Sequence, residues 1–168
     1  WAGRWKGSGN RIIFPLFDSA GVVRSVIARL ARLPLTGEPK SLAPTGYSRR
    51  GLVLSEANGR ELLRLGDALP AEAAAKSQVP KSTVRLHVLE GEIDFALACL
   101  RERRQRTDEY VAVMGIFSGS FTPEIGARIP RESLVVCQTD DDAQGEQYAA
   151  TVKAALRAGV LYVRMSPS

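Results

Sequence analysis

The stretch Val84-Arg-Leu-His-Val-Leu-Glu-Gly-Glu-Ile-Asp94 joins a predicted strand to three carboxylates. Val84 to Leu89 is predicted to form a strand, and Glu90 follows it directly. A buried strand would therefore hold this carboxylate at the rim of a sheet, and Gly91 would let the chain turn tightly into a helix. The acidic end of this strand is a first candidate for a functional site.

A helix is predicted to follow this strand. Its apolar residues recur at i, i+3, i+4 and i+7, and we expect one buried face that holds Ile93, Ala96, Leu97 and Leu100. Its other end carries a run of arginines that is more typical of a solvated helix end than of a nucleic-acid contact, namely Arg101, Arg103, Arg104 and Arg106.

Strands and helices continue to alternate after this helix. Strands are predicted at 111–116, 134–137 and 160–163, and helices at 122–128 and from Tyr148 to Leu156. Apolar strands that alternate with helices indicate a parallel sheet with both faces covered. The predicted fold class is therefore α/β.

A second acidic cluster, Asp140-Asp-Asp142, follows the predicted strand at 134–137. Working residues of such sheets sit at the carboxyl ends of strands. Asp140 and Asp142 are two residues apart and can point to one side, whereas Asp141 would face away and cap a helix. Carboxylates gathered without histidine or thiolate ligands favour Mg²⁺ or Mn²⁺. The alternative is that these aspartates are only helix-cap and first-turn charges.

The first half of the chain predicts a strand-rich unit. Two β-rich runs, 11–17 and 22–30, flank the turn-forming Asp18-Ser-Ala-Gly21 and predict a hairpin. Pro15 has no N–H group, so its strand should lie at an edge.

The segment after the hairpin is rich in proline and glycine. It predicts a long ordered loop or short strands over 33–50, then a strand at 51–54 and a helix over 56–65 that ends at Gly66. Residues 67–83 are predicted to be a linker with a possible helical turn, and they are the best candidate for a domain boundary.

Charge is divided unequally between the two halves. Residues 1–83 hold 13 Lys and Arg against 6 Asp and Glu, whereas residues 84–168 hold 10 against 12. This predicts a polyanion bound by the first half and cations by the second, unless the positive charge is merely scattered over a solvated surface.

Two cysteines, expected to be buried, and one histidine cannot form a usual zinc site. No apolar run spans a bilayer and no secretory signal is present, so we expect a cytoplasmic protein.

The pattern Glu-Gly-x-x-Asp at Glu90 to Asp94, followed by Asp-x-Asp at Asp140 to Asp142, resembles the Toprim domain of bacterial primases, topoisomerases and related nucleases. The similarity covers roughly residues 84–164, including the small-residue loop Gly115-Ile-Phe-Ser-Gly-Ser120. The segments 11–18, 21–23, 27–29 and 39–42 resemble the basic N-terminal subdomain of the bacterial and phage primase core, in the same order. Topoisomerases do not have that segment before their Toprim domain. The resemblance therefore points to primases of the DnaG type or their phage and plasmid relatives.

The resemblance implies a Toprim-type parallel sheet flanked by helices and preceded by a small basic subdomain. The implied boundaries are 1–66 for the subdomain, 67–83 for the linker and 84–168 for the Toprim domain. It implies a primase core that makes RNA primers on a single-stranded DNA template from ribonucleoside triphosphates. A replicative helicase would bind through regions that this chain does not contain, and no membrane partner is implied.

The same resemblance assigns roles to individual residues. Glu90, Asp140 and Asp142 would be catalytic and, together with Asp94, would bind Mg²⁺ or Mn²⁺. Phosphates of the nucleotide or template would contact the basic residues Arg29, Lys40, Arg49 and Arg50.

The chain also departs from the family. Primases carry a further acidic pair after the last Toprim strand, whereas this chain stops at Met165-Ser-Pro-Ser168, and it has no zinc-binding element. We therefore expect an excised core or a reduced relative. Two alternatives are a Toprim nuclease, against which the basic N-terminal segment argues, and a noncatalytic nucleic-acid-binding module.

Overall fold

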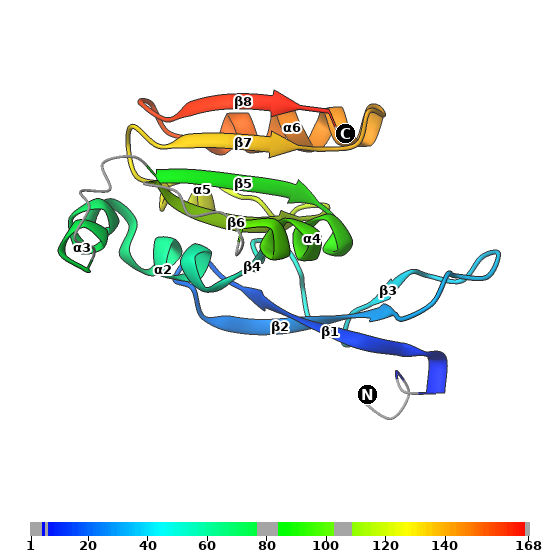
Figure 1. Cartoon of the computed structure of the whole chain (residues 1–168). Helices are drawn as coiled ribbons and strands as arrows, with labels where there is room; N and C mark the ends of the chain where they lie inside the picture. Colours follow the sequence, from blue (N-terminus) through cyan, green and yellow to red (C-terminus); the bar gives the residue numbers. More distant parts are fainter. Residues whose placement is uncertain (1–4, 6, 77–83, 103–108, 167–168) are drawn as a thin grey trace.

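A computed structural model describes residues 5, 7–76, 84–102 and 109–166 and contains two sheets (Figure 1). The first has three antiparallel strands in the order β1-β2-β3, and the second has five in the order β4-β6-β5-β7-β8. Residues 77–83 of the predicted linker lie outside the described residues, as do Arg103, Arg104 and Arg106.

The first sheet consists of β1 (Asn10–Phe17), β2 (Val23–Leu30) and β3 (Ser41–Leu42). Oδ1 of Asp18 stabilises the hairpin turn by accepting hydrogen bonds from Ala20 N at 2.9 Å and Val22 N at 3.0 Å. Gly21 is needed in this turn because its φ is 72° and a Cβ there would lie 2.8 Å from the Arg60 carbonyl oxygen. The predicted hairpin is confirmed, with Pro15 on edge strand β1.

A short connection leads from the first sheet to the second. Val53 and Phe17 exchange two backbone hydrogen bonds of 2.9 Å, and β4 (Leu54–Ser55) then pairs with the second sheet. The strand was predicted at 51–54, whereas β4 begins only at Leu54, because Val53 is already paired with Phe17. Helix α2 (Ala57–Leu65) follows, and its predicted end at Gly66 is confirmed.

The predicted linker holds more helix than expected. It contains most of η1 (Gly66–Ala68) and the two-turn helix α3 (Leu69–Lys76). Leu69 is fully buried in the same core as β5 because α3 packs beside α2. The division into 1–66 and 84–168 remains a prediction, although β4 and α2 pack with the second sheet.

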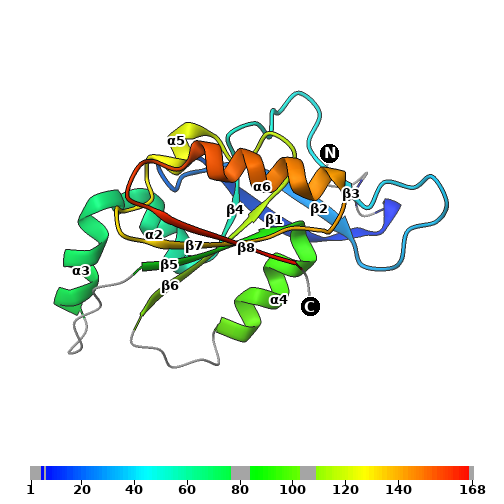
Figure 2. The same cartoon turned by 90° about the horizontal axis from the view of Figure 1, so that it is seen from above.

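The second sheet contains four parallel strands, with β4 antiparallel at its edge. The parallel strands are β5 (Val84–Glu90), β6 (Tyr110–Ile116), β7 (Leu134–Gln138) and β8 (Leu161–Met165). Helices α5 (Pro123–Gly126) and α6 (Ala143–Ala155) lie on one face and α4 (Glu92–Glu102) on the other (Figure 2). The α/β class is confirmed, and the carboxyl ends of neighbouring strands β5 and β7 come side by side.

Two apolar clusters hold this arrangement together. The larger packs α2, α5 and α6 against the second sheet. The smaller joins Leu16 and Ile27 of the first sheet to Leu54, Val113 and Phe95. This second cluster fixes the first sheet against β4, β6 and α4.

Helix α4 is rotated relative to the predicted orientation. The predicted buried face is wrong, since Ile93 is 39% exposed, Leu97 45% and Leu100 55%. The helix instead buries Glu92 and Phe95. Phe95 packs edge-on against Phe14 of the first sheet, with ring centroids 6.4 Å apart. The rotation of the helix is therefore set by the contact with the first sheet and not by the number of apolar residues on one side of the helix.

Two expectations from composition can also be compared with the structure. Cys137 is fully buried as predicted, whereas Cys99 is only half-buried. Within the described residues, no helix combines the length and apolar character needed to cross a membrane.

Candidate active site

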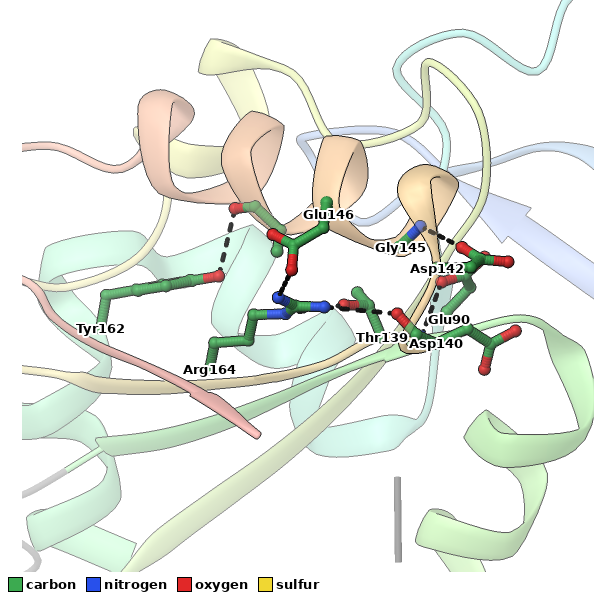
Figure 3. A network of polar contacts seen from close by, with 9 residues as sticks. Glu90, Thr139, Asp140, Asp142, Gly145, Glu146, Tyr162 and Arg164 are labelled. Carbon is green, nitrogen blue, oxygen red and sulfur yellow. Dashed lines mark hydrogen bonds and ion pairs between the residues drawn. The ribbon is translucent and has the colours of Figure 1, made fainter. Parts of the chain in front are cut away.

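The structure brings the two acidic strand ends together. Glu90 ends β5, and Asp140 follows the adjacent strand β7, where Leu89 pairs with Gln138. Oε2 of Glu90 accepts a hydrogen bond from Asp140 N at 3.1 Å (Figure 3). Asp94, in the first turn of α4, and Asp142, before α6, complete a group that we call the acidic crest: Glu90, Asp94, Asp140 and Asp142.

The carboxylates of the acidic crest influence one another. Burial raises the pKa of Glu90 above its usual 4.5, and the negative charges of Asp140, Asp142 and Asp94 raise it further. The hydrogen bond from Asp140 N acts in the opposite direction. A cation placed among these groups would relieve their repulsion.

The chemistry of the acidic crest fits a hard divalent cation. All four side chains offer carboxylate oxygens, which Mg²⁺ and Mn²⁺ prefer. Across 5, 7–76, 84–102 and 109–166, no three acidic, His or Cys side chains are close enough together to hold a metal ion as they stand. Mg²⁺ usually keeps several waters and needs few protein ligands. Glu90, Asp94, Asp140 and Asp142 are the residues that would hold it, and these assignments remain predictions.

Asp142 has a structural role that the sequence analysis gave to its neighbour. Its Oδ1 accepts a hydrogen bond from Gly145 N at 2.8 Å and caps α6. Asp141 is exposed and is not the cap, so that prediction is wrong. The reason is local geometry: Asp142 has an extended backbone and lies three residues before Gly145, the spacing of an N-cap bond.

Gly145 allows the acidic loop to close tightly. A Cβ at this position would lie 1.9 Å from the Asp140 carbonyl oxygen and 3.0 Å from Asp140 N. Any larger residue would therefore push apart the loop that carries Asp140 and Asp142.

Arg164 of β8 supports the acidic loop from the neighbouring strand (Figure 3). Its Nε donates to Thr139 Oγ1 at 3.3 Å and its Nη2 to the Asp140 carbonyl oxygen at 3.3 Å. Its Nη1 forms an ion pair with Glu146 of α6, and this bond raises the pKa of Arg164. Sequence reasoning missed this residue, although a charged residue in the apolar strand Leu161-Tyr-Val-Arg-Met165 was a usable signal.

Arg29 connects the first sheet to the acidic crest. Its Nη1 lies 2.6 Å from Oε2 of Glu92, and both side chains are largely buried. Glu92 lies between the predicted ligands Glu90 and Asp94. The predicted nucleotide-binding Arg29 therefore already has a carboxylate partner in this structure.

The other predicted basic residues are exposed. The guanidinium of Arg49 lies over the Phe117 ring, 5.2 Å from its centroid, in the loop after β6. Arg50 packs near Gly119 of the same loop. Lys40 lies next to β3, where its carbonyl oxygen accepts from Leu30 N at 3.0 Å. The structure thus brings Arg49 and Arg50 to a loop at the same end of the sheet as the acidic crest, whereas Lys40 belongs to the first sheet.

A hollow of 80 Å³ lies between the carboxyl ends of the strands and α4. Glu90, Asp94 and Asp140 line it together with Leu97 and Arg101. Arg101 is exposed, as predicted, yet it shares this hollow with three carboxylates. A small hydrated ion or a phosphate oxygen in this hollow would lie near both the negative carboxylates and the positive guanidinium of Arg101.

Comparison with known proteins agrees with this geometry. Residues 87–168 match a family model described as Toprim-like. No curated protein sequence matches the chain.

Several solved primases share the fold. A DnaG primase catalytic domain bound to single-stranded DNA has a TM-score of 0.55 at 19% identity and covers 95% of this chain and 45% of that chain. The E. coli primase catalytic core has a TM-score of 0.53 at 20% identity with the same coverage. The Aquifex aeolicus primase, with zinc-binding and RNA polymerase domains, has a TM-score of 0.54 at 15% identity and covers 94% of this chain and 34% of that chain.

This chain spans less than half the length of those solved primases. Its antiparallel sheet and its Toprim-like sheet follow each other as they were expected to do from the sequence. The chain shares the fold of a part of the DnaG primase catalytic cores, and residues 87–168 are its Toprim-like part.

Proposed function

We propose that this chain is a primase catalytic core that joins ribonucleotides on a single-stranded DNA template. The observation that carries the proposal is the acidic crest, in which burial and three neighbouring carboxylates raise the pKa of Glu90 within a primase-type fold. A carboxyl group with a perturbed pKa at the carboxyl end of a parallel sheet is a functional-site candidate.

Each part of the site has a distinct task in this proposal. Glu90, Asp140 and Asp142, with Asp94 beside them, hold divalent cations. When bound, such cations lower the pKa of the attacking 3′ hydroxyl and stabilise the charge on the transferred phosphoryl group. Arg164 keeps the acidic loop in place by donating a hydrogen bond to the Asp140 carbonyl oxygen, and Gly145 lets the loop close because it has no Cβ.

The first half of the chain would bind the polyanions. Residues 1–83 carry 13 Lys and Arg against 6 Asp and Glu, and Lys40, Arg49 and Arg50 are exposed there. Template and ribonucleoside triphosphates are the partners proposed for this surface. A replicative helicase is a further proposed partner, and the proposed place of action is the cytoplasm.

A single assay tests the function. The chain is incubated with labelled ribonucleotides, Mn²⁺ and single-stranded DNA, with and without an annealed RNA primer. We expect weak extension of the primer and little unprimed synthesis, because initiation must assemble two free nucleotides whereas extension needs only one.

Two other outcomes of this assay contradict the proposed function, and a third contradicts only the expected weakness of initiation. Shortening of the DNA instead of extension would indicate a Toprim nuclease. Binding of DNA without either reaction would indicate a noncatalytic module. Efficient initiation at defined sites would contradict the expectation of weak extension alone.

Replacing Lys40 and Arg50 together by Ala should weaken single-stranded DNA binding and its salt dependence. Each lost phosphate contact reduces the log-log slope against salt by about 0.7, so the double variant should lose up to about 1.4. Fluorescence anisotropy at several salt concentrations measures the slope. In the control, Arg64 and Lys153 are replaced by Ala, which removes the same amount of charge elsewhere on the surface. An equal change of the salt slope in both double variants would place the DNA on another surface.

Arg164→Met should weaken Mn²⁺ binding by about 10–100-fold, the usual effect of removing a residue that orients metal ligands. Calorimetric titration with Mn²⁺ measures this. Arg24→Met is the control, because Arg24 also forms an exposed ion pair, 2.6 Å from Asp18, in the hairpin of the first sheet. Unchanged Mn²⁺ affinity in Arg164→Met would mean that Arg164 does not support the ligands.

A further inference from the structure

A second and larger hollow opens on the face of the sheet that carries α6. Its volume is 490 Å³, within the roughly 300–1,000 Å³ of small-molecule sites. One wall is the loop after β6, at 117–121, and the other is α6 over residues 143–151. The carboxylates of the acidic crest do not line it.

The lining is uncharged but rich in aromatic and amide groups. Phe117 provides a half-buried ring, Phe121 and Tyr148 line the hollow with rings that lie mostly in the core, and Gln144 and Gln147 provide exposed amides. Nε2 of Gln144 donates a hydrogen bond to the Tyr148 hydroxyl. A glutamine amide offers a donor and an acceptor side by side, the combination that base edges pair with, and aromatic rings stack on bases. This lining suits a flat, uncharged heterocycle.

Both walls of the hollow adjoin the acidic crest. Ala143 follows Asp142 directly, and the Ile116 carbonyl oxygen accepts a hydrogen bond from Gly91 N, next to Glu90, at 3.0 Å. The guanidinium of Arg49 lies over the ring of Phe117. A phosphate attached to a heterocycle in this hollow would therefore extend toward cation-binding carboxylates or toward Arg49.

We propose that this hollow between the loop 117–121 and α6 binds a nucleobase. The inference rests on the proposed function, because that function makes nucleotides the ligands of the neighbouring crest. The base would stack against the aromatic surface while the amides of Gln144 and Gln147 contact its edge. It comes either from the incoming ribonucleotide or from the template strand, and the test distinguishes these sources.

Amide chemical shifts of the whole chain, measured in chelator without metal, locate the ligand. Adenosine and ATP are titrated separately. Both should shift the amides of 116–121 and 143–151, because a base alone suffices for this contact. The proposal would be overturned if adenosine did not shift these amides, or if it shifted only amides elsewhere in the chain.

Two tryptophan variants on the same helix test the hollow itself. Gln147→Trp fills it and should weaken adenosine binding at least tenfold. Ala154→Trp is the matched control, since Ala154 is exposed on α6 and does not line the hollow. Equal adenosine affinity of Gln147→Trp and Ala154→Trp would overturn the proposal, and thermal melting of both variants verifies that the fold persists.

A further titration with DNA identifies the source of the base. If a short DNA oligonucleotide shifts the same amides and its abasic counterpart does not, the base belongs to the template. Shifts with adenosine and ATP but not with the oligonucleotide assign the base to the incoming nucleotide. Equal shifts with the abasic strand would overturn the proposal. Primer extension without adenosine shifts in the hollow would reject this inference alone, and adenosine binding there without extension would reject the proposed function alone.

Discussion

Glu90→Gln is expected to reduce primer extension by at least about 100-fold. The amide keeps the shape of the side chain but loses the negative charge that would hold a divalent cation. Metal ions supply several kcal/mol of transition-state stabilisation, and about 1.4 kcal/mol corresponds to a tenfold change in rate. Single-turnover extension with Mn²⁺ measures the effect, and calorimetric titration should show a parallel loss of Mn²⁺ affinity.

Asp141→Asn is the control for this variant. It makes the same carboxylate-to-amide change in the same acidic run, but Asp141 is exposed and does not cap α6. Activity should stay within about tenfold of the wild type, as expected for an exposed charge outside the site. Full activity of Glu90→Gln would remove Glu90 from the mechanism.

Glu90→Gln is expected to stabilise the folded protein although it reduces activity. Because the pKa of Glu90 is raised in the folded protein, its charged form opposes folding. In chelator, Glu90→Gln should therefore melt at a higher temperature than the wild type at neutral pH. The difference should vanish below the ordinary pKa of 4.5, where Glu90 is protonated in both states, and grow as the pH rises through its folded value. A lower melting temperature at neutral pH would contradict the repulsion within the acidic crest.

Gly145→Ala should disable the site by another route. A Cβ would lie 1.9 Å from the Asp140 carbonyl oxygen, so the loop must move by about the 1 Å that can cost 10²-fold in rate. Overpacking of this kind costs roughly 1–3 kcal/mol, which lowers the melting temperature by about 2–4 °C per kcal/mol in a protein of this size. We expect a loss of extension of about 100-fold and a measurable loss of stability.

Gly7→Ala provides the comparison, because no atom beyond the adjoining chain lies within 4 Å of the Cβ that this substitution adds. Its melting temperature and activity should equal those of the wild type. Thermal melting in chelator and primer extension are measured on both variants. If Gly145→Ala behaved like Gly7→Ala, the acidic loop would tolerate displacement and the tight closure at Gly145 would have no functional importance.

Several features of this fold could be predicted because they depend on residues close together in the chain. The hairpin follows from the turn at Asp18 to Gly21, and the end of α2 follows from Gly66. The meeting of Glu90 with Asp140 required only that two apolar strands be parallel neighbours. Once the α/β pattern was recognised, topology placed both acidic strand ends on one edge.

Contacts between distant segments decided the rest. Helix α4 turned away from its apolar stripe because Phe95 packs against Phe14 and Glu92 pairs with Arg29. Arg29 and Glu92 are 63 positions apart in the sequence, so no local pattern reveals that pair. Arg164 reaches the acidic loop only because β8 lies beside β7.

The division between the two kinds of information has a physical basis. Backbone periodicity and turn chemistry act over a few residues, so the sequence by itself determined most strands and helices, though not α3, and the chemical type of the candidate site. The rotation of α4 and the partners of Arg29 and Arg164 depend on how packed elements fit together. Several orientations of each element satisfy the same local pattern, and burial and ion pairing in the folded chain select one of them.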